Sequence, residues 1–152
     1  MQKPGKLKVL PGAEPPSDYV VDFQVGFLMR VAMQRHTSIF MANMIEDLTQ
    51  TQFAVMAKLH EVGPCSQNHL GRLVYLDAAT IKGVVDRLSG RGFVMTADDP
   101  LDRRRRAVAL TERGHAVADA AVLVALEISA ATLEPLNPDE RKQAIALLRK
   151  LG

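Results

Sequence analysis

Apolar residues recur at helical spacing along most of the chain, and this pattern predicts a largely helical fold. The clearest stretch runs from Asp77 to Leu88. Its apolar residues are three and four positions apart and therefore share one face: Ile81, Val84, Val85 and Leu88. The other face carries small or hydrogen-bonding residues: Ala78, Ala79, Thr80, Lys82, Gly83, Asp86 and Arg87. Such a helix is able to enter the major groove of DNA, and Asp77 is placed to cap it.

A second helix, beginning at Ser66, is expected just before this one. Leu70 to Leu73 forms its last turn, and Gly71 is small enough for two helices to cross closely at that point. Residues Val74 to Leu76 then make a tight turn. The two helices and the turn between them predict a helix-turn-helix.

A β-hairpin is predicted after the helix-turn-helix. Gly92 ends the second helix, and the segments Phe93–Thr96 and Ala107–Leu110 read as two short strands. The loop between them ends in four consecutive arginines, Arg103 to Arg106, which repel one another unless an anion or solvent surrounds them. Taken alone, this run fits a solvated loop equally well. Directly after a helix-turn-helix, it favours a DNA-binding wing.

The N-terminal part of the chain predicts one long helix over residues 18–47, loosened near Thr37-Ser38. An apolar stripe at helical spacing runs along it: Phe23, Phe27, Met33, Phe40, Met41 and Met44. These side chains are either simply core or an adaptable lining for a small apolar ligand. A stripe of this length needs more burial than one small domain offers, which indicates packing against a second chain.

Three further helices are expected from the residues at their ends. Thr49 and Gln52 form a capping box at the start of the first. Thr111 caps an alanine-rich helix that runs to Leu133, and Asn137 opens a last helix. The apolar face of this last helix carries Leu147, Leu148 and Leu151.

Together these elements predict a mainly α fold with a small β-wing, in which a winged helix-turn-helix is joined to a helical dimerisation region. We expect four parts: a flexible N-terminal arm (1–17), a dimerisation helix (18–47), a DNA-binding lobe (48–111) and C-terminal dimerisation helices (112–152). The first part is rich in proline and glycine, which disfavour a helix.

Composition narrows the class of protein. The chain has 152 residues, of which 47% are hydrophobic and 24% charged, as in an ordinary soluble globular protein. The net charge is only +2, but nine basic and six acidic residues lie between Ser66 and Arg113, so basicity is concentrated at the expected DNA-binding lobe. The single cysteine excludes an internal disulfide framework. We expect no signal peptide, no long apolar run and no membrane contact, and hence a cytoplasmic protein.

Several motifs resemble those of the MarR family of bacterial transcription regulators. They are Leu48-Thr49 with Gln52-Phe53, the stretch Asp77 to Leu88, Arg91-Gly92-Phe93-Val94, Asp99-Pro100-Leu101-Asp102-Arg103-Arg104, and Leu110-Thr111-Glu112-Arg113-Gly114. The last two, at this spacing, are the most specific, and the similarity extends over most of the chain. The resemblance implies an obligate homodimer, joined through its terminal helices, that binds double-stranded DNA.

Roles for single residues follow in part from this resemblance. Thr80 and Lys82 are the candidates for contacts to base edges, and Arg87 for a phosphate contact. The family's wing tip enters the minor groove, with Asp102 orienting Arg104; an Asp102–Arg104 pair that only staples the hairpin is the alternative. The remaining arginines are expected to neutralise phosphates: Arg103, Arg105 and Arg106. A twofold dimer then requires a pseudo-palindromic site.

Two departures from the family pattern change these expectations. Tyr75 occupies a turn position where the family usually has glycine. Lys82-Gly83 replaces the more common Thr-Arg. Glycine inside a helix costs about 1 kcal/mol relative to alanine, so Gly83 is expected to permit close approach to the sugar-phosphate backbone.

The family commonly binds small aromatic acids where the dimerisation helices meet the DNA-binding lobe. A ligand there releases DNA when it favours a half-site spacing that does not fit the operator. The candidate ligand-binding residues are Phe23, Phe27, Arg30, His36, Phe40 and His60. Arg30 and the histidines are able to hold a carboxylate, and a structural or solvated role is the alternative for each. Hydroxylated nicotinates are one ligand class, and repression is the expected sign of regulation.

Other mechanisms are weaker. Cys65 lies in the Gly63-Pro64 turn, whereas the family's peroxide sensors carry their cysteine in the first helix. A zinc sensor would draw on the histidines, but their spacing forms no ligand pair: His36, His60, His69 and His115. No nucleotide-binding loop or hydrolase motif indicates an enzyme, and no cofactor or metal is expected. A protein-interaction module would leave the arginine run unexplained.

Overall fold

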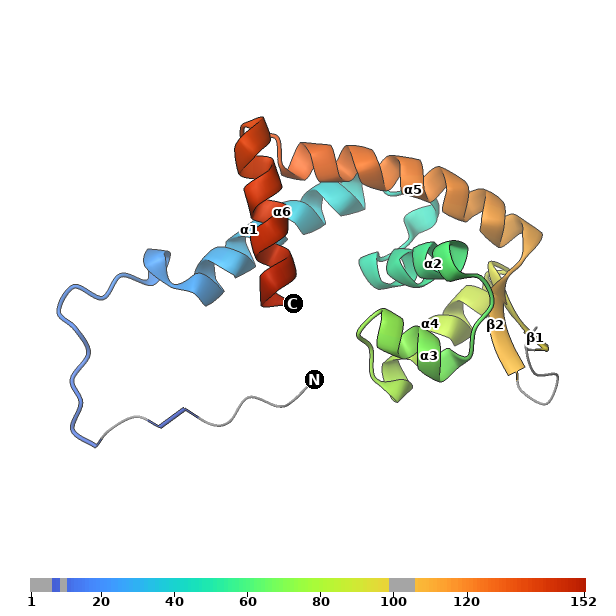
Figure 1. Ribbon diagram of the computed structural model, residues 1–152, viewed down its shortest axis with the longest axis horizontal. Coiled ribbons are helices and arrows are strands. Elements are labelled where there is room, and N and C mark those ends of the chain that lie inside the picture. The colour runs from blue at the N-terminus through green and yellow to red at the C-terminus, as the bar shows by residue number, and fades with distance from the viewer. Residues whose placement is uncertain (1–6, 9–10, 99–105) are drawn as a thin grey trace. The chain divides into compact units, whose positions relative to one another are not determined.

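The computed structural model describes residues 7–8, 11–98 and 106–152 (Figure 1). Its elements are η1 (Val21–Phe23), α1 (Val25–Asn43), η2 (Ile45–Asp47), α2 (Gln50–Val62), α3 (Gln67–Leu73), α4 (Ala78–Gly90), β1 (Val94–Asp98), β2 (Arg106–Leu110), α5 (Glu112–Thr132) and α6 (Pro138–Leu151). The chain divides into two compact units, residues 1–34 and 35–152. The predicted mainly α fold with a small β-wing is confirmed.

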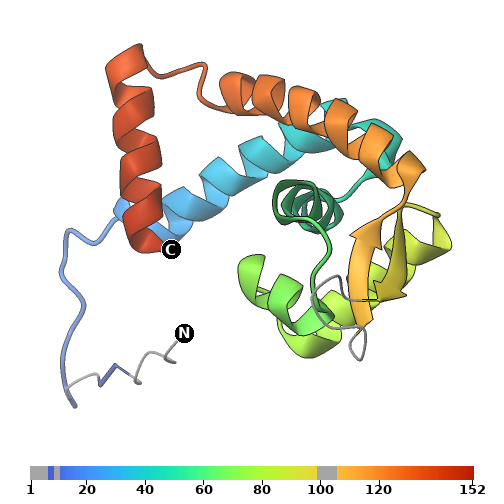
Figure 2. The same ribbon diagram turned by 45° about the vertical axis from the view of Figure 1, so that its right-hand side comes forward.

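The second unit contains the core. Helices α2, α3 and α4 pack on one another, and α5 packs along α2. The hairpin follows α4 and leads directly into α5 (Figure 2). The largest fully buried side chains come from the α1–α2 junction, α2, α3, α4 and the residue before the hairpin: Leu48, Val55, Met56, Leu59, Leu70, Ile81, Val84, Leu88 and Phe93. This core holds the helix-turn-helix and the wing base as one body.

The predicted turn and end signals are confirmed. Thr49 and Gln52 form the capping box of α2, and Ser66 and Asp77 cap α3 and α4. Gly71 lies at the crossing of α3 and α4, where an added Cβ would be 3.2 Å from the Ile81 side chain. Local hydrogen bonds and helical spacing therefore suffice to define these elements.

The predicted helix over residues 18–47 is wrong in its bounds and in the place of its break. α1 runs through Thr37-Ser38 without interruption and ends at Asn43. The chain bends after it, because Glu46 and Asp47 adopt left-handed backbone angles, with φ of 54° and 48°. Such angles are costly for residues with a side chain, so neighbouring contacts must hold this bend.

The hairpin begins one residue later than predicted and extends further, with Val94 paired to Leu110 and Asp98 to Arg106. Phe93 instead completes the end of α4, because its N–H donates to the Leu88 carbonyl while Gly92 takes φ of 76°. The Phe93 carbonyl then accepts the Thr111 N–H at 3.0 Å. An added Cβ on Gly114 would lie 1.9 Å from that carbonyl oxygen, so only glycine fits at the start of α5.

Helix α5 bears on the expectation of no long apolar run, although Asp119 and Glu127 interrupt its apolar residues. By length and composition alone, this helix is long and apolar enough to cross a membrane. One side of it, at Ala118, Ala121 and Ile128, is buried in the core, whereas Leu123 and Leu126 are exposed. Alanine and other apolar residues thus lie on both sides of the helix, beyond what the core covers.

Candidate DNA-binding surface

The outward face of α4 is the centre of the candidate surface. All four apolar residues predicted to face the core are buried: Ile81, Val84, Val85 and Leu88. Ala78, Ala79 and Thr80 are exposed in the first turn, followed by Lys82, Asp86 and Arg87, while Gly83 is half-buried. The face predicted from the sequence is therefore free of large apolar groups and available to a polar partner.

The N-terminus of α4 is fixed by Asp77 and Thr80. The Asp77 carboxylate accepts the Thr80 N–H at 2.8 Å and the Thr80 hydroxyl at 2.9 Å. The backbone hydrogen bond from Thr80, followed by the one from its hydroxyl, lowers the pKa of the Asp77 carboxyl below its ordinary value of 3.8. Thr80 thus already uses its hydroxyl proton, which leaves the hydroxyl oxygen free to act as an acceptor.

Lys82 and Asp86 form a pair in the middle of this face. The Lys82 Nζ lies 2.6 Å from an Asp86 carboxylate oxygen, one helical turn away. The sequence places Asp86 on this face but indicates no role for it. Its i, i+4 spacing from Lys82 is the signal that reveals the pair. A lysine ammonium group can donate to the acceptor atoms of guanine. An aspartate carboxylate can accept from the amino group of cytosine.

Gly83 has no steric reason to be glycine within the chain itself. An added Cβ would meet the Arg87 guanidinium at 3.6 Å, which is ordinary van der Waals contact. The fold therefore tolerates alanine there, and the close approach to the sugar-phosphate backbone expected from the sequence stays a prediction.

Polar groups of α3 extend the surface beyond the predicted residues. A pocket of about 310 Å³ lies between α3 and α4 and is lined by Asn68, Gly71, Arg72, Leu76, Ala78 and Ile81. Asn68 and Arg72 are exposed and are one helical turn apart, next to the first turn of α4. Their spacing of one helical turn on α3, the helix before α4, is the feature of the sequence that indicates them.

The wing is described only at its base. Asp102, Arg103, Arg104 and Arg105, the predicted tip, lie outside the described residues. Arg106 pairs with Asp98 across the hairpin at 3.5 Å and donates to the Thr96 carbonyl at 3.3 Å. Arg106 is therefore oriented by its own hairpin, with an exposed guanidinium.

Known proteins match this arrangement. The model of the MarR family covers residues 48–105. The HTH-type transcriptional repressor NicR of Pseudomonas putida is 43% identical over 134 residues, which are 88% of this chain and 85% of NicR. The chain belongs to the MarR family. It is thus a winged-helix, DNA-binding transcription regulator, and its relatives are regulators rather than enzymes.

Solved structures of MarR-type proteins share both fold and sequence with it. A probable transcriptional regulator from Pseudomonas aeruginosa is 44% identical, with a TM-score of 0.83 over 88% of this chain and 100% of that one. BpsR of Bordetella bronchiseptica, whose DNA binding is regulated by 6-hydroxynicotinic acid, is 39% identical. Its TM-score is 0.80, over 89% of this chain and 97% of BpsR.

The six candidate ligand-binding residues of this MarR-family chain fall into three groups. Phe23, Phe27 and Arg30 belong to the first unit, where the Arg30 guanidinium lies 5.0 Å from the centre of the Phe27 ring. His36 and Phe40 form the second group, at the end of α1. His60 forms the third, where its Nε2 lies 2.6 Å from an Asp119 carboxylate oxygen.

The second group has defined chemistry. Phe40 is 3% exposed and packs between His36 and Phe53. The Thr132 hydroxyl donates to the Ile128 carbonyl, so its oxygen accepts from His36 Nδ1 at 2.9 Å. Neutral His36 then carries its proton on Nδ1 and presents Nε2 as an acceptor.

The residues of the rival sensing mechanisms are also placed. Cys65 is half-buried, and its backbone pairs with Val108 at 2.9 and 3.2 Å, which ties the segment before α3 to β2. The rings of His60 and His115 lie 6.1 Å apart. Within the described part of the chain, no group of three or more His, Cys, Asp or Glu residues is arranged to hold a metal ion.

Proposed function

We propose that this MarR-family protein is a homodimeric repressor that leaves a pseudo-palindromic operator when a small aromatic acid binds. The observation that carries the proposal is the exposed face of α4, whose residues are small or polar. The chain that presents this face is 43% identical to a repressor over 134 residues. Two such helices in a twofold dimer reach successive major grooves about 34–36 Å apart. Lys82, Thr80 and Asp86 then read base edges, and arginines contact phosphates.

Exposed apolar side chains support the homodimer. In α6, all of whose residues are described, none is buried, and its leucines lie exposed: Leu147, Leu148 and Leu151. Leu123 and Leu126 add to this surface from α5. Large exposed apolar patches are unfavourable in water and mark interfaces. We assign residues 18–47 and 112–152 to dimerisation, which also accounts for the apolar length of α5 in a cytoplasmic protein.

The proposed effector class is a heteroaromatic acid of the hydroxynicotinate type. BpsR responds to 6-hydroxynicotinic acid and is 39% identical over 89% of this chain. His36 packs against the Phe40 ring, which in turn packs against Phe53, and an imidazole beside aromatic rings suits a flat ring with a carboxylate. The acid acts by binding more tightly to a dimer whose half-site spacing does not fit the operator.

A mobility-shift titration on the DNA upstream of its own and neighbouring genes tests this function. We expect tight binding that weakens steeply with salt and that 6-hydroxynicotinic acid releases, while benzoic acid acts as the ring control. Binding that no acid affects removes the effector and directs the test to Cys65 oxidation and to added zinc. No specific binding at any salt concentration sinks the proposal and favours a protein-interaction module.

A further inference from the structure

Glu46 stands at a bend that the local sequence does not explain. It follows α1 in the short helix η2, and both it and Asp47 have left-handed backbone angles. No glycine or proline lies at this bend. A costly conformation persists when its surroundings determine it, and such positions are often functional. Contacts of Glu46 with other parts of the chain must therefore stabilise this bend.

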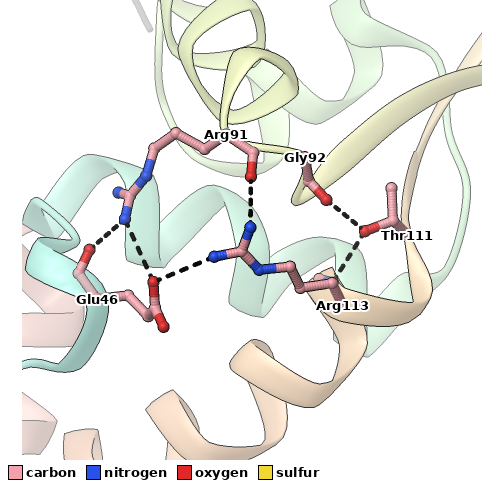
Figure 3. A network of polar contacts seen from close by, with 6 residues as sticks. Glu46, Arg91, Gly92, Thr111 and Arg113 are labelled. Atoms are coloured by element: carbon pink, nitrogen blue, oxygen red, sulfur yellow. Dashed lines mark hydrogen bonds and ion pairs between the residues drawn. The ribbon is translucent and has the colours of Figure 1, made fainter.

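Two arginines from distant parts of the chain hold Glu46 (Figure 3). Arg91, at the end of α4, donates to the Glu46 backbone carbonyl and lies 3.6 Å from its carboxylate. Arg113, in the first turn of α5, lies 3.7 Å from the same carboxylate and donates to the Arg91 carbonyl at 3.3 Å. Glu46 thus links the α1–α2 junction to the end of α4 and the start of α5.

The same arginines enclose Phe93, the residue directly before the wing. Their guanidinium carbons lie 4.7 and 4.8 Å from the centre of the buried Phe93 ring. The Phe93 carbonyl also accepts from Thr111, whose hydroxyl donates to the Gly92 carbonyl at 2.7 Å. The recognition helix ends and the wing begins at this point, so a shift of Glu46 is transmitted to both.

The network is too exposed to act mainly through stability. Glu46 is 40% exposed and Arg113 63%, and ion pairs with such exposure contribute little free energy of folding. Its geometry, in contrast, is specific, because one carboxylate and one carbonyl fix two guanidinium groups. Its effect is therefore on orientation.

We propose that Glu46 is a positioning residue for DNA binding, which fixes the recognition helix and the wing base relative to the end of α1. This inference rests on the proposed dimeric operator binding, because in a dimer the orientation of each lobe sets the distance between the recognition helices. A fixed lobe binds one operator spacing well. A loosened lobe accepts several spacings and binds each less tightly.

The test compares Glu46→Gln with Glu61→Gln on operators whose two half-sites are moved apart or together by one base pair. Glu61 is a matched control, because it pairs only with Lys58 within α2 among the described contacts, and its loss changes the net charge equally. We expect Glu46→Gln to bind the natural spacing about fivefold or more weakly and to lose most of the wild-type discrimination between spacings. Glu61→Gln should retain it.

Arg113→Gln provides a second variant, since it removes the other arm of the network from an exposed position. Melting temperatures identify any variant that fails to fold, and Arg113→Gln then carries the test alone. A spacing profile unchanged from wild type in either folded variant overturns the inference while leaving the proposed function intact. Failure of the wild-type protein to bind any operator overturns the proposed function itself.

Discussion

Helices α4 and α6 are both amphipathic, but they differ in how far a single chain covers their apolar faces. In α4 every large apolar residue is buried against α2, α3 and the hairpin, and the outward face is small and polar. In α6 the leucines remain exposed, Leu148 at 58% and Leu151 at 72%. The first helix is complete within the chain and offers a surface to a polar partner. The second leaves its apolar face uncovered, and this is where we propose that a second chain binds.

The apolar face of α6 and the polar face of α4 suit two different kinds of interaction. Burying apolar surface is favourable in proportion to area and is not directional, so α6 suits a permanent contact. The face of α4 relies on hydrogen bonds and charge, which give specificity and depend on salt. A repressor needs both: a lasting dimer, and a DNA contact that an effector can release.

The largest expected effect comes from breaking the apolar face of α6. Leu148→Glu places a charge where we expect the second chain, so sedimentation should show a monomer. Operator affinity should fall at least about a hundredfold, because the two half-sites are no longer bound together. Ala146→Glu adds the same charge on the opposite, exposed side of α6 and should leave the dimer intact. A dimeric Leu148→Glu protein would contradict the assignment of α6.

A smaller effect is expected from Lys82→Ala on the face of α4. Loss of one base contact costs about 1–3 kcal/mol, or about fivefold to 150-fold in affinity, and should relax selectivity at one base pair of each half-site. Competition with operators substituted one position at a time measures this. The dimer and the melting temperature should not change, since Lys82 contacts only the exposed Asp86 among the described residues. Uniform weakening on every operator would make Lys82 a phosphate contact instead.

Features of α4 were predictable from the sequence because the interactions that define it are local. The Asp77 cap lies three residues from its donor Thr80, and the apolar face repeats within one helix. The break after α1 was not predictable in this way. Glu46 is held by Arg91 and Arg113, 45 and 67 positions further along, and no proline or glycine marks the bend.

The candidate ligand residues show the same limit. Residue type indicated that His36 and His60 are able to hold a carboxylate, but their partners are set by α5. His36 meets Thr132 near the end of that helix, and His60 meets Asp119 in its first half. The two histidines thus belong to separate sites, and residue type alone does not distinguish this from one shared pocket. The sequence motif that contains Gly114 was recognisable. The reason why glycine is needed there is the nearby Phe93 carbonyl, which is distant in the sequence.

Gly83→Ala sharpens the contrast between folding and binding within α4. Alanine is accommodated in the chain and favours the helix by about 1 kcal/mol, so the melting temperature should rise. Operator affinity should nevertheless fall by about tenfold, equivalent to one lost backbone contact. Thermal unfolding and mobility shifts on the same preparation provide the two readings. An increase in both stability and affinity would show that DNA does not approach this position closely.

The smallest expected effect concerns the cap that α4 supplies for itself. The pKa of Asp77 is lowered in the folded chain by its hydrogen bonds from Thr80, so its ionised form stabilises the fold above pH 3.8 and this contribution is lost as the pH falls below that value. Asp77→Asn keeps a capping oxygen but has no charge to titrate. The melting temperature of wild type should therefore fall more steeply than that of Asp77→Asn between about pH 4 and pH 2. Parallel curves would mean that the carboxylate charge adds nothing to the cap. In that case α4 depends on its buried face alone, and the first turn that carries Thr80 is held by tertiary packing rather than by its own sequence.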